Sequence, residues 1–84
     1  GNGIIKRPDR VMIKNNQAIV LDYKFGENQE KSHINQIIQY GNLLKNMRFN
    51  KVEMYIWYVL QNVLLKVEND KTISEIKFDQ NTIF

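Results

Sequence analysis

The chain runs Asp-Arg-Val-Met-Ile-Lys over residues 9–14, Asn-Asn at 15–16 and Gln-Ala-Ile-Val-Leu-Asp-Tyr-Lys over 17–24. Both outer segments are rich in β-branched and aliphatic side chains, which predicts two strands. Asparagine tolerates the left-handed backbone conformation that a two-residue hairpin turn requires. This stretch therefore predicts a β-hairpin whose whole loop is Asn15 and Asn16.

The predicted hairpin determines which side chains face one another. With a two-residue loop, Lys14 pairs with Gln17, and counting outward from that pair places Asp9 opposite Asp22. Lys24 shares their face of the hairpin, because side chains alternate along a strand. The same face carries the apolar residues Val11, Ile13 and Val20.

Two carboxylates on facing strand positions repel each other, and a divalent cation between them removes the repulsion. Carboxylate and carbonyl oxygens are hard ligands that suit Mg²⁺ or Mn²⁺. The Lys24 ammonium could orient a water molecule or stabilise charge on a phosphate. The pattern thus favours metal-assisted phosphodiester hydrolysis. The alternative is that these are solvated residues at strand ends, and a register slip of one residue would separate Asp9 from Asp22.

The remaining elements follow from hydrophobic periodicity. An apolar stripe at three- and four-residue spacing predicts a helix over residues 29–47, with Asn28 as N-cap and Glu30 in the first turn. Residues 51–60 are apolar on both faces, which predicts a central strand. Further strands are expected at 63–68 and, more weakly, at 73–78. The order β-β-α-β-β(-β) predicts an α+β domain with a mixed sheet.

The composition of the chain excludes several classes of protein. The 84 residues are enough for one small domain, and the 43% hydrophobic content indicates a globular fold. The lack of cysteine excludes disulfides and thiolate metal sites and fits a reducing cytoplasm. No apolar stretch approaches the length of a membrane helix. The net charge of +3 is compatible with nucleic-acid binding but indicates it only weakly.

Three motifs resemble the RecB-like nuclease family of the PD-(D/E)XK superfamily. They are Arg-Pro-Asp-Arg-Val at 7–11, Val-Leu-Asp-Tyr-Lys-Phe-Gly at 20–26 and, on the predicted helix, Gln-Ile-Ile-Gln-Tyr at 36–40. The Asp-Tyr-Lys tripeptide after an apolar strand and a Gln-x-x-x-Tyr motif on the next helix characterise that family. The resemblance covers roughly residues 3–68, and residues 69–84 are expected to be a tail or an extra strand.

The resemblance implies a restriction-endonuclease-like core and a role for each motif residue. Asp9 and Asp22 would ligate Mg²⁺ or Mn²⁺ together with the backbone carbonyl of Tyr23, and Lys24 would be the catalytic lysine. On the helix, Gln36 and Tyr40 would line the site and help to position DNA or the lysine. Of the basic residues, Arg7 and Arg10 flank Asp9 and are those we expect to contact DNA.

Complete members of the family carry an upstream helix, often with a further acidic residue or histidine that completes the metal site. We expect the chain to be a partial nuclease domain that lacks this helix, which would leave Val11, Ile13, Val20 and part of the strand at 51–60 exposed. This uncovered face is expected to self-associate, or to pack against the missing segment in the parent protein, and the fragment by itself is expected to cut DNA slowly or not at all. The strand at 51–60 resembles the C-terminal part of AddA- and RecB-type helicase–nucleases, exonucleases of double-strand break repair and recombination.

A helicase region upstream in the same polypeptide and a second repair subunit are therefore expected partners, besides DNA. The alternative function is a non-catalytic DNA-binding or subunit-interaction module that retains the fold. His33 follows the Asp-Tyr-Lys motif, so it is not the upstream ligand, and we interpret it as a surface or flanking residue. Tyr55, Trp57 and Tyr58 are interpreted as core residues, with a base-stacking platform as the alternative.

Overall fold

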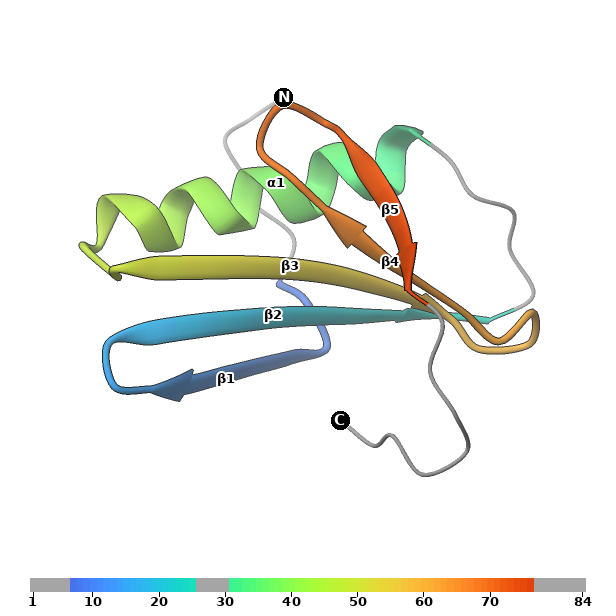
Figure 1. Ribbon diagram of the computed structural model, residues 1–84, viewed down its shortest axis with the longest axis horizontal. Helices are drawn as coiled ribbons and strands as arrows, with labels where there is room; N and C mark the ends of the chain where they lie inside the picture. Colours follow the sequence, from blue (N-terminus) through green and yellow to red (C-terminus); the bar gives the residue numbers. More distant parts are fainter. Residues whose placement is uncertain (1–6, 26–30, 77–84) are drawn as a thin grey trace.

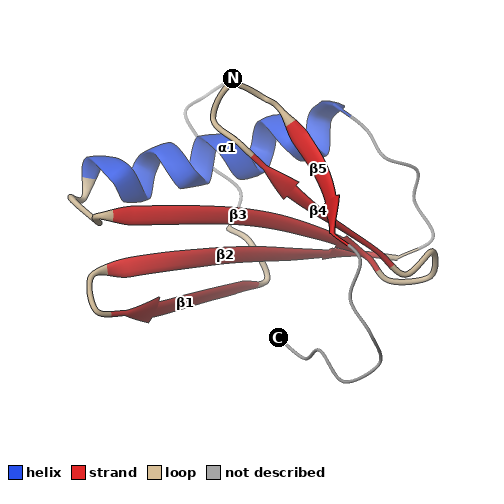
Figure 2. Cartoon of the chain, in the orientation of Figure 1, coloured by secondary structure: helices blue, strands red, loops and turns tan. Residues whose placement is uncertain are grey.

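The computed structural model describes residues 7–25 and 31–76. These residues form a five-stranded mixed sheet and one helix that lies across one of its faces (Figures 1 and 2). No helix in the described ranges is long and apolar enough to cross a membrane. The predicted α+β class is confirmed, with the elements in the order β1 (Arg10–Lys14), β2 (Gln17–Lys24), α1 (Lys31–Asn46), β3 (Lys51–Tyr58), β4 (Val63–Val67) and β5 (Ile73–Ile76).

The element boundaries differ from the predicted ones by one or two residues. Asp9 precedes β1 instead of beginning it. Strand β3 ends at Tyr58, two residues early, because a turn follows in which the Asn62 N–H donates to the Val59 carbonyl at 3.1 Å. Asn62 has the left-handed φ of 55° that this turn uses. The predicted helix cap at Asn28 and Glu30, and residues 77–78, lie outside the described residues.

The hairpin of β1 and β2 has the predicted loop and register. Asn15 and Asn16 both have positive φ, 52° and 62°, as a two-residue turn of this kind requires. The pairs Val11↔Val20 and Ile13↔Ala18 continue from Lys14↔Gln17. The predicted facing arrangement of the two strands is therefore correct.

Strand β3 is the middle strand of the sheet, as its apolar sequence predicts. The strand order is β1-β2-β3-β4-β5, in which β2 and β3 are parallel and every other pair is antiparallel. A parallel connection needs a crossover, and α1 provides it. The crossover brings the ends of β2 and β3 together, so that Lys24 pairs with Tyr58.

The main core lies between α1 and the sheet. The predicted stripe on the helix is buried, and it packs on Val20, Ile56 and Tyr58, which are all at most 1% exposed. Burial of each large apolar side chain stabilises the fold by about 1.5–3 kcal/mol. This core holds the helix over β2 and β3. The buried helix residues are Ile34, Ile37, Ile38, Gly41 and Leu44.

The opposite face of the sheet carries a smaller cluster around Leu21, Tyr55 and Leu64. Tyr55 is therefore buried on one face of β3 and Tyr58 on the other, which confirms their interpretation as core residues. Trp57 is partly buried and packs on Tyr23, with 5.8 Å between the ring centroids. Neither buried tyrosine offers an open ring face to a nucleotide base.

One expectation about the hairpin face needs correction. Lack of an upstream helix was expected to leave Val11, Ile13, Val20 and part of β3 exposed, yet Val20 is 0% exposed because α1 covers it. Val11 is half-buried and packs against the main core, whereas Ile13, near the turn of the hairpin, is 59% exposed. The uncovered apolar area on this face is therefore smaller than predicted.

Gly41 sets the distance between the helix and the sheet. A Cβ atom at this position would overlap Sδ of Met54, a side chain of β3 that is 2% exposed. The absence of a side chain thus allows α1 to approach the sheet closely. This approach also determines how near the polar residues on the flank of the helix lie to β2.

We expect Gly41→Val to lower the free energy of unfolding by about 2–3 kcal/mol, because added bulk in a packed core displaces the helix. Asn42→Val is the matched control, since it introduces the same side chain at the adjacent, exposed position of α1. Thermal unfolding should show a midpoint lowered by roughly 8–20 °C for the first variant alone. Equal midpoints for the two variants would contradict the close approach.

Candidate functional site

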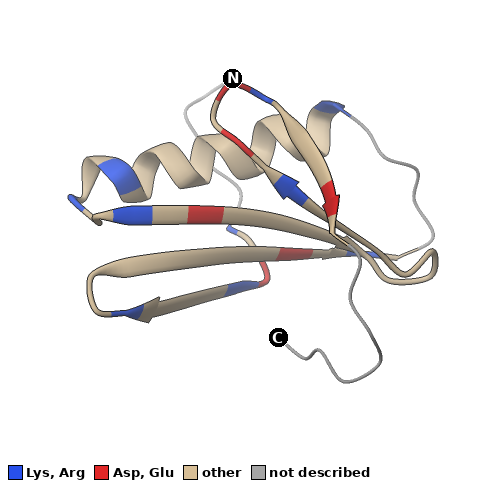
Figure 3. Cartoon of the chain, in the orientation of Figure 1, with Lys and Arg blue, Asp and Glu red and all other residues tan. Residues whose placement is uncertain are grey.

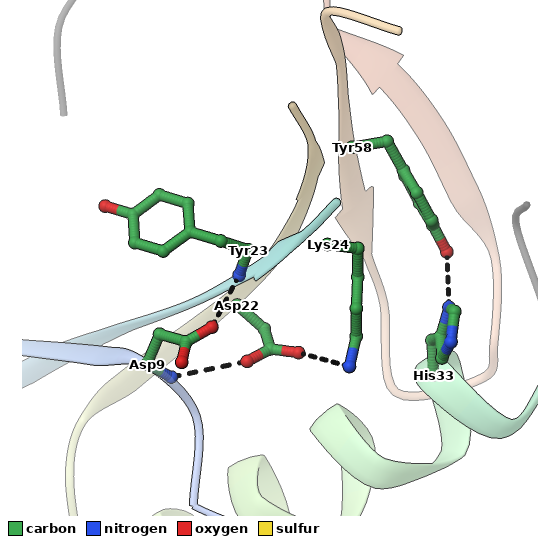
Figure 4. A network of polar contacts seen from close by, with 6 residues as sticks. All are labelled: Asp9, Asp22, Tyr23, Lys24, His33 and Tyr58. Carbon is green, nitrogen blue, oxygen red and sulfur yellow. Dashed lines mark hydrogen bonds and ion pairs between the residues drawn. The ribbon is translucent and has the colours of Figure 1, made fainter. Parts of the chain in front are cut away.

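Asp9 and Asp22 lie side by side at the start of the hairpin (Figure 4). The Asp9 N–H donates to Oδ1 of Asp22 at 3.3 Å, and the Tyr23 N–H donates to Oδ2 of Asp9 at 2.9 Å. Each carboxylate is therefore held by a backbone group of the other strand segment. The geometry brings together the two acidic residues that the hairpin register predicts to face each other.

The backbone carbonyl of Tyr23 points toward the same edge of β2 as its N–H. Backbone groups of successive strand residues point to opposite edges. The carbonyl of Lys24 accepts from the Val59 N–H at 2.9 Å on the β3 side, so the Tyr23 carbonyl faces Asp9. Continuing the hairpin register places Pro8 opposite Tyr23, and proline has no N–H to donate. The carbonyl oxygen is thus placed to act as a third oxygen ligand.

Lys24 completes the polar group. Its Nζ lies 3.1 Å from Oδ2 of Asp22, and its side chain is only 9% exposed. A buried ammonium needs a charged or strongly polar partner, and Asp22 supplies one. The lysine thus lies at the inner end of the site, with Asp22 between it and Asp9 (Figure 4).

The pKa of the Asp22 carboxyl is raised above its usual 3.8. Burial is the main cause, and the hydrogen bond with Asp9 adds to it, whereas Lys24 acts in the opposite direction. The folded chain therefore retains a proton at pH values where the unfolded chain has lost it. The stability associated with this proton is fully present below pH 3.8 and is lost as the pH rises through the raised pKa.

At neutral pH without divalent cations, we expect Asp9→Asn to raise the free energy of unfolding by up to ~1 kcal/mol. The amide oxygen can still accept the Tyr23 N–H, while the repulsion between carboxylates disappears. Because the repulsion is smaller in Asp9→Asn, its free energy of unfolding should fall less than that of the wild type as the pH rises. Thermal unfolding in a chelator checks this, and addition of Mg²⁺ should reverse the order by stabilising only the wild type. A wild type that is more stable than the variant in both conditions would argue against a strained carboxylate pair.

Two polar residues of α1, Gln36 and Tyr40, line a pocket beside Asp22. The pocket has a volume of ≈ 10 Å³, room for about one water molecule, and is lined by Asp22 of β2 and by residues of α1 and of the segment before β1. Gln36 and Tyr40 are half-buried on the flank of the apolar stripe, as their spacing predicts. The other lining residues are Arg7, Pro8 and Ile37.

Basic residues near the carboxylates are exposed. Arg7 lines the pocket, and Arg10 begins β1, an edge strand of the sheet. Figure 3 shows basic and acidic positions close together where the chain enters β1. Both arginines lie beside Asp9 along the chain, and both are exposed to solvent. Arginine binds phosphate with paired N–H groups, so Arg7 could direct a phosphate toward the pocket.

The donor set fits a hard divalent cation. Mg²⁺ commonly binds one or two carboxylates and retains several waters, which matches Asp9, Asp22 and the Tyr23 carbonyl. Within residues 7–25 and 31–76, no group of three or more His, Asp or Glu side chains could hold a metal ion.

His33, near the site, makes a contact that the sequence did not predict. It is partly buried, and its Nδ1 lies 2.9 Å from the hydroxyl of Tyr58, at the end of β3 (Figure 4). The interpretation as a surface or flanking residue did not include this contact, which arises because the crossover brings the first turn of α1 to the end of β3. Its place three residues before Gln36, on the same side of a helix, was the available signal.

Comparisons of the chain with protein-family models, with curated proteins and with solved structures find no match.

Proposed function

We propose that the chain is a metal-dependent DNA nuclease domain of the PD-(D/E)XK type, similar to RecB-like nucleases. The observation that supports this most is the place of Asp22, which contacts Asp9 and Lys24 and also lines a small pocket together with Gln36 and Tyr40. Asp9, Asp22 and Lys24 come from the hairpin, and Gln36 and Tyr40 come from the helix. All five are motif positions of the family that the sequence resembles.

In this proposal, Asp9, Asp22 and the Tyr23 carbonyl hold Mg²⁺ or Mn²⁺, which supplies Lewis acidity at a phosphodiester. Lys24 orients the attacking water and stabilises negative charge that develops on the phosphate. The pocket has room for about one water beside Asp22, and its walls are formed in part by Gln36 and Tyr40. Arg7 and Arg10 contact backbone phosphates of the DNA.

The proposal includes a biological setting. The domain would be the C-terminal part of a cytoplasmic helicase–nuclease that acts as an exonuclease in double-strand break repair. Its partners would be DNA, the helicase region of the same polypeptide and a second repair subunit. This setting rests on the resemblance of the sequence to AddA- and RecB-type proteins.

A non-catalytic DNA-binding or subunit-interaction module is the second candidate. It is favoured by the polar contacts of the site, which satisfy the charged groups without a cation. Asp22 pairs with Lys24, and Asp9 accepts the Tyr23 N–H. Such a network could be kept for structure alone.

Cleavage of end-labelled linear DNA with Mg²⁺, with Mn²⁺ and with a chelator distinguishes the two candidates. A nuclease should shorten the DNA with either cation and stop when the chelator is added. A module that only binds should shift the DNA in a gel without shortening it in any condition. The latter result, obtained also with a longer parent polypeptide, would reject the nuclease proposal.

A further inference from the structure

Tyr58 and His33 form a partly buried polar contact that the proposed chemistry does not use. Tyr58 is 1% exposed, and its hydroxyl lies 2.9 Å from Nδ1 of His33. A buried hydroxyl needs a hydrogen-bond partner, and here the partner comes from α1, 25 residues away in sequence. The contact joins the first turn of the helix to the last residue of β3.

Lys24 lies next to this contact. It pairs with Tyr58 across the parallel strands β2 and β3, at a spacing of about 4.8 Å between strands. Figure 4 shows that both side chains project from their strands toward α1, with Lys24 between Asp22 and the Tyr58–His33 pair. The tyrosine ring thus stands on the side of the lysine that faces away from Asp22.

A lysine side chain has several rotatable bonds and loses about 2 kcal/mol of conformational free energy when it is fixed. It stays against Asp22 only if its surroundings restrict the other rotamers. We propose that Tyr58 and His33 are positioning residues that hold the Lys24 ammonium against Asp22, an inference that rests on the proposed nuclease function. The Tyr58 ring restricts the rotamers open to the Lys24 side chain, and the hydrogen bond to His33 holds the Tyr58 ring in place.

The same contact anchors the helix. His33 lies one helical turn before Gln36, so the bond to Tyr58 restrains the turn from which Gln36 reaches the pocket. Further along α1, the close approach of Gly41 to Met54 restrains the next turns. The His33–Tyr58 pair therefore links the position of the lysine to that of the helix.

The test uses Tyr58→Phe and His33→Leu, which each remove the contact from one side. We expect cleavage turnover to fall about 10- to 100-fold in both, because small displacements of a catalytic group have effects of this size. The KM for DNA and the affinity for Mn²⁺ should stay unchanged. The double variant should be no slower than either single variant, since one contact is lost in all three.

Two further variants distinguish loss of Lys24 positioning from a general loss of stability. His33→Asn can present a polar atom near the position of Nδ1 and should restore most of the turnover. Tyr55→Phe is the matched control, because it removes the 2.7 Å hydrogen bond from the Tyr55 hydroxyl to Glu53 on the opposite face of β3. It should affect stability without affecting turnover. An equal loss of turnover in Tyr55→Phe would overturn the proposal.

Nuclear magnetic resonance of the Lys24 side chain provides a readout that needs no cleavage. We expect its ε-methylene signal to be distinct from those of exposed lysines in the wild type and to move toward them in Tyr58→Phe. An unchanged signal together with unchanged turnover would overturn the positioning role. If the wild type cuts no DNA even within a longer parent polypeptide, the nuclease proposal fails, and the Lys24 signal still decides whether Tyr58 and His33 order the lysine.

Discussion

Replacing Lys24 with alanine is expected to lower the rate of Mg²⁺-dependent DNA cleavage at least ~100-fold, the scale of losing one electrostatic or acid–base group. The ammonium lies 3.1 Å from a carboxylate oxygen of Asp22 and is almost fully buried. A positive charge fixed in such surroundings stabilises a phosphate that gains negative charge more strongly than it would in water.

Binding of DNA by the Lys24→Ala variant should remain close to that of the wild type, because binding is spread over many phosphate contacts. In a longer helicase-containing parent, strand unwinding should also continue. Lys31→Ala is the matched control, since Lys31 is an exposed lysine in the first turn of α1. The measurement is a cleavage assay run beside a binding assay. Wild-type cleavage by Lys24→Ala would make Lys24 a structural partner of Asp22 and would remove the main support for a nuclease.

The hairpin half of the site could be predicted because its determinants are local. Two asparagines that accept positive φ define the loop, and strand alternation then places Asp9 near Asp22. Helical spacing likewise predicts that Gln36 and Tyr40 share one flank of α1. These inferences require only the sequence within one supersecondary unit.

The other half of the site depends on contacts between distant segments. Lys24 and Tyr58 are neighbours because β2 and β3 pair in parallel. The register of that pairing is set by how α1 packs across the two strands. Neither residue carries a local signal for that register. The His33 contact and the burial of Val20 have the same origin, which is why the sequence predicted neither of them.

Replacing Asp22 with asparagine is expected to abolish specific binding of Mn²⁺ and to reduce cleavage at least as much as loss of Lys24. Asp22 links the proposed metal ligands to the proposed catalytic lysine, because its carboxylate contacts both Asp9 and Lys24. An amide is a weaker ligand for a hard cation than a carboxylate. The variant also leaves the buried ammonium without this negative charge.

Loss of one partner of a buried ion pair costs about 3–5 kcal/mol, a large part of the roughly 4–13 kcal/mol available to a domain of this length. Lower stability could therefore imitate a loss of function in Asp22→Asn. The double variant Asp22→Asn/Lys24→Met removes the unpaired charge and should recover most of the stability, yet it should bind no Mn²⁺ and cut no DNA.

Calorimetric titration with Mn²⁺ at increasing pH measures the metal affinity of the wild type and of the double variant. Because the raised pKa of Asp22 lets a proton compete with the cation, affinity in the wild type should increase as the pH rises through that pKa and then level off. The double variant should show no binding at any pH. Mn²⁺ binding of wild-type strength in a folded Asp22→Asn/Lys24→Met variant would place the metal site elsewhere in the chain, and Asp22 would then be only the ion-pair partner of Lys24.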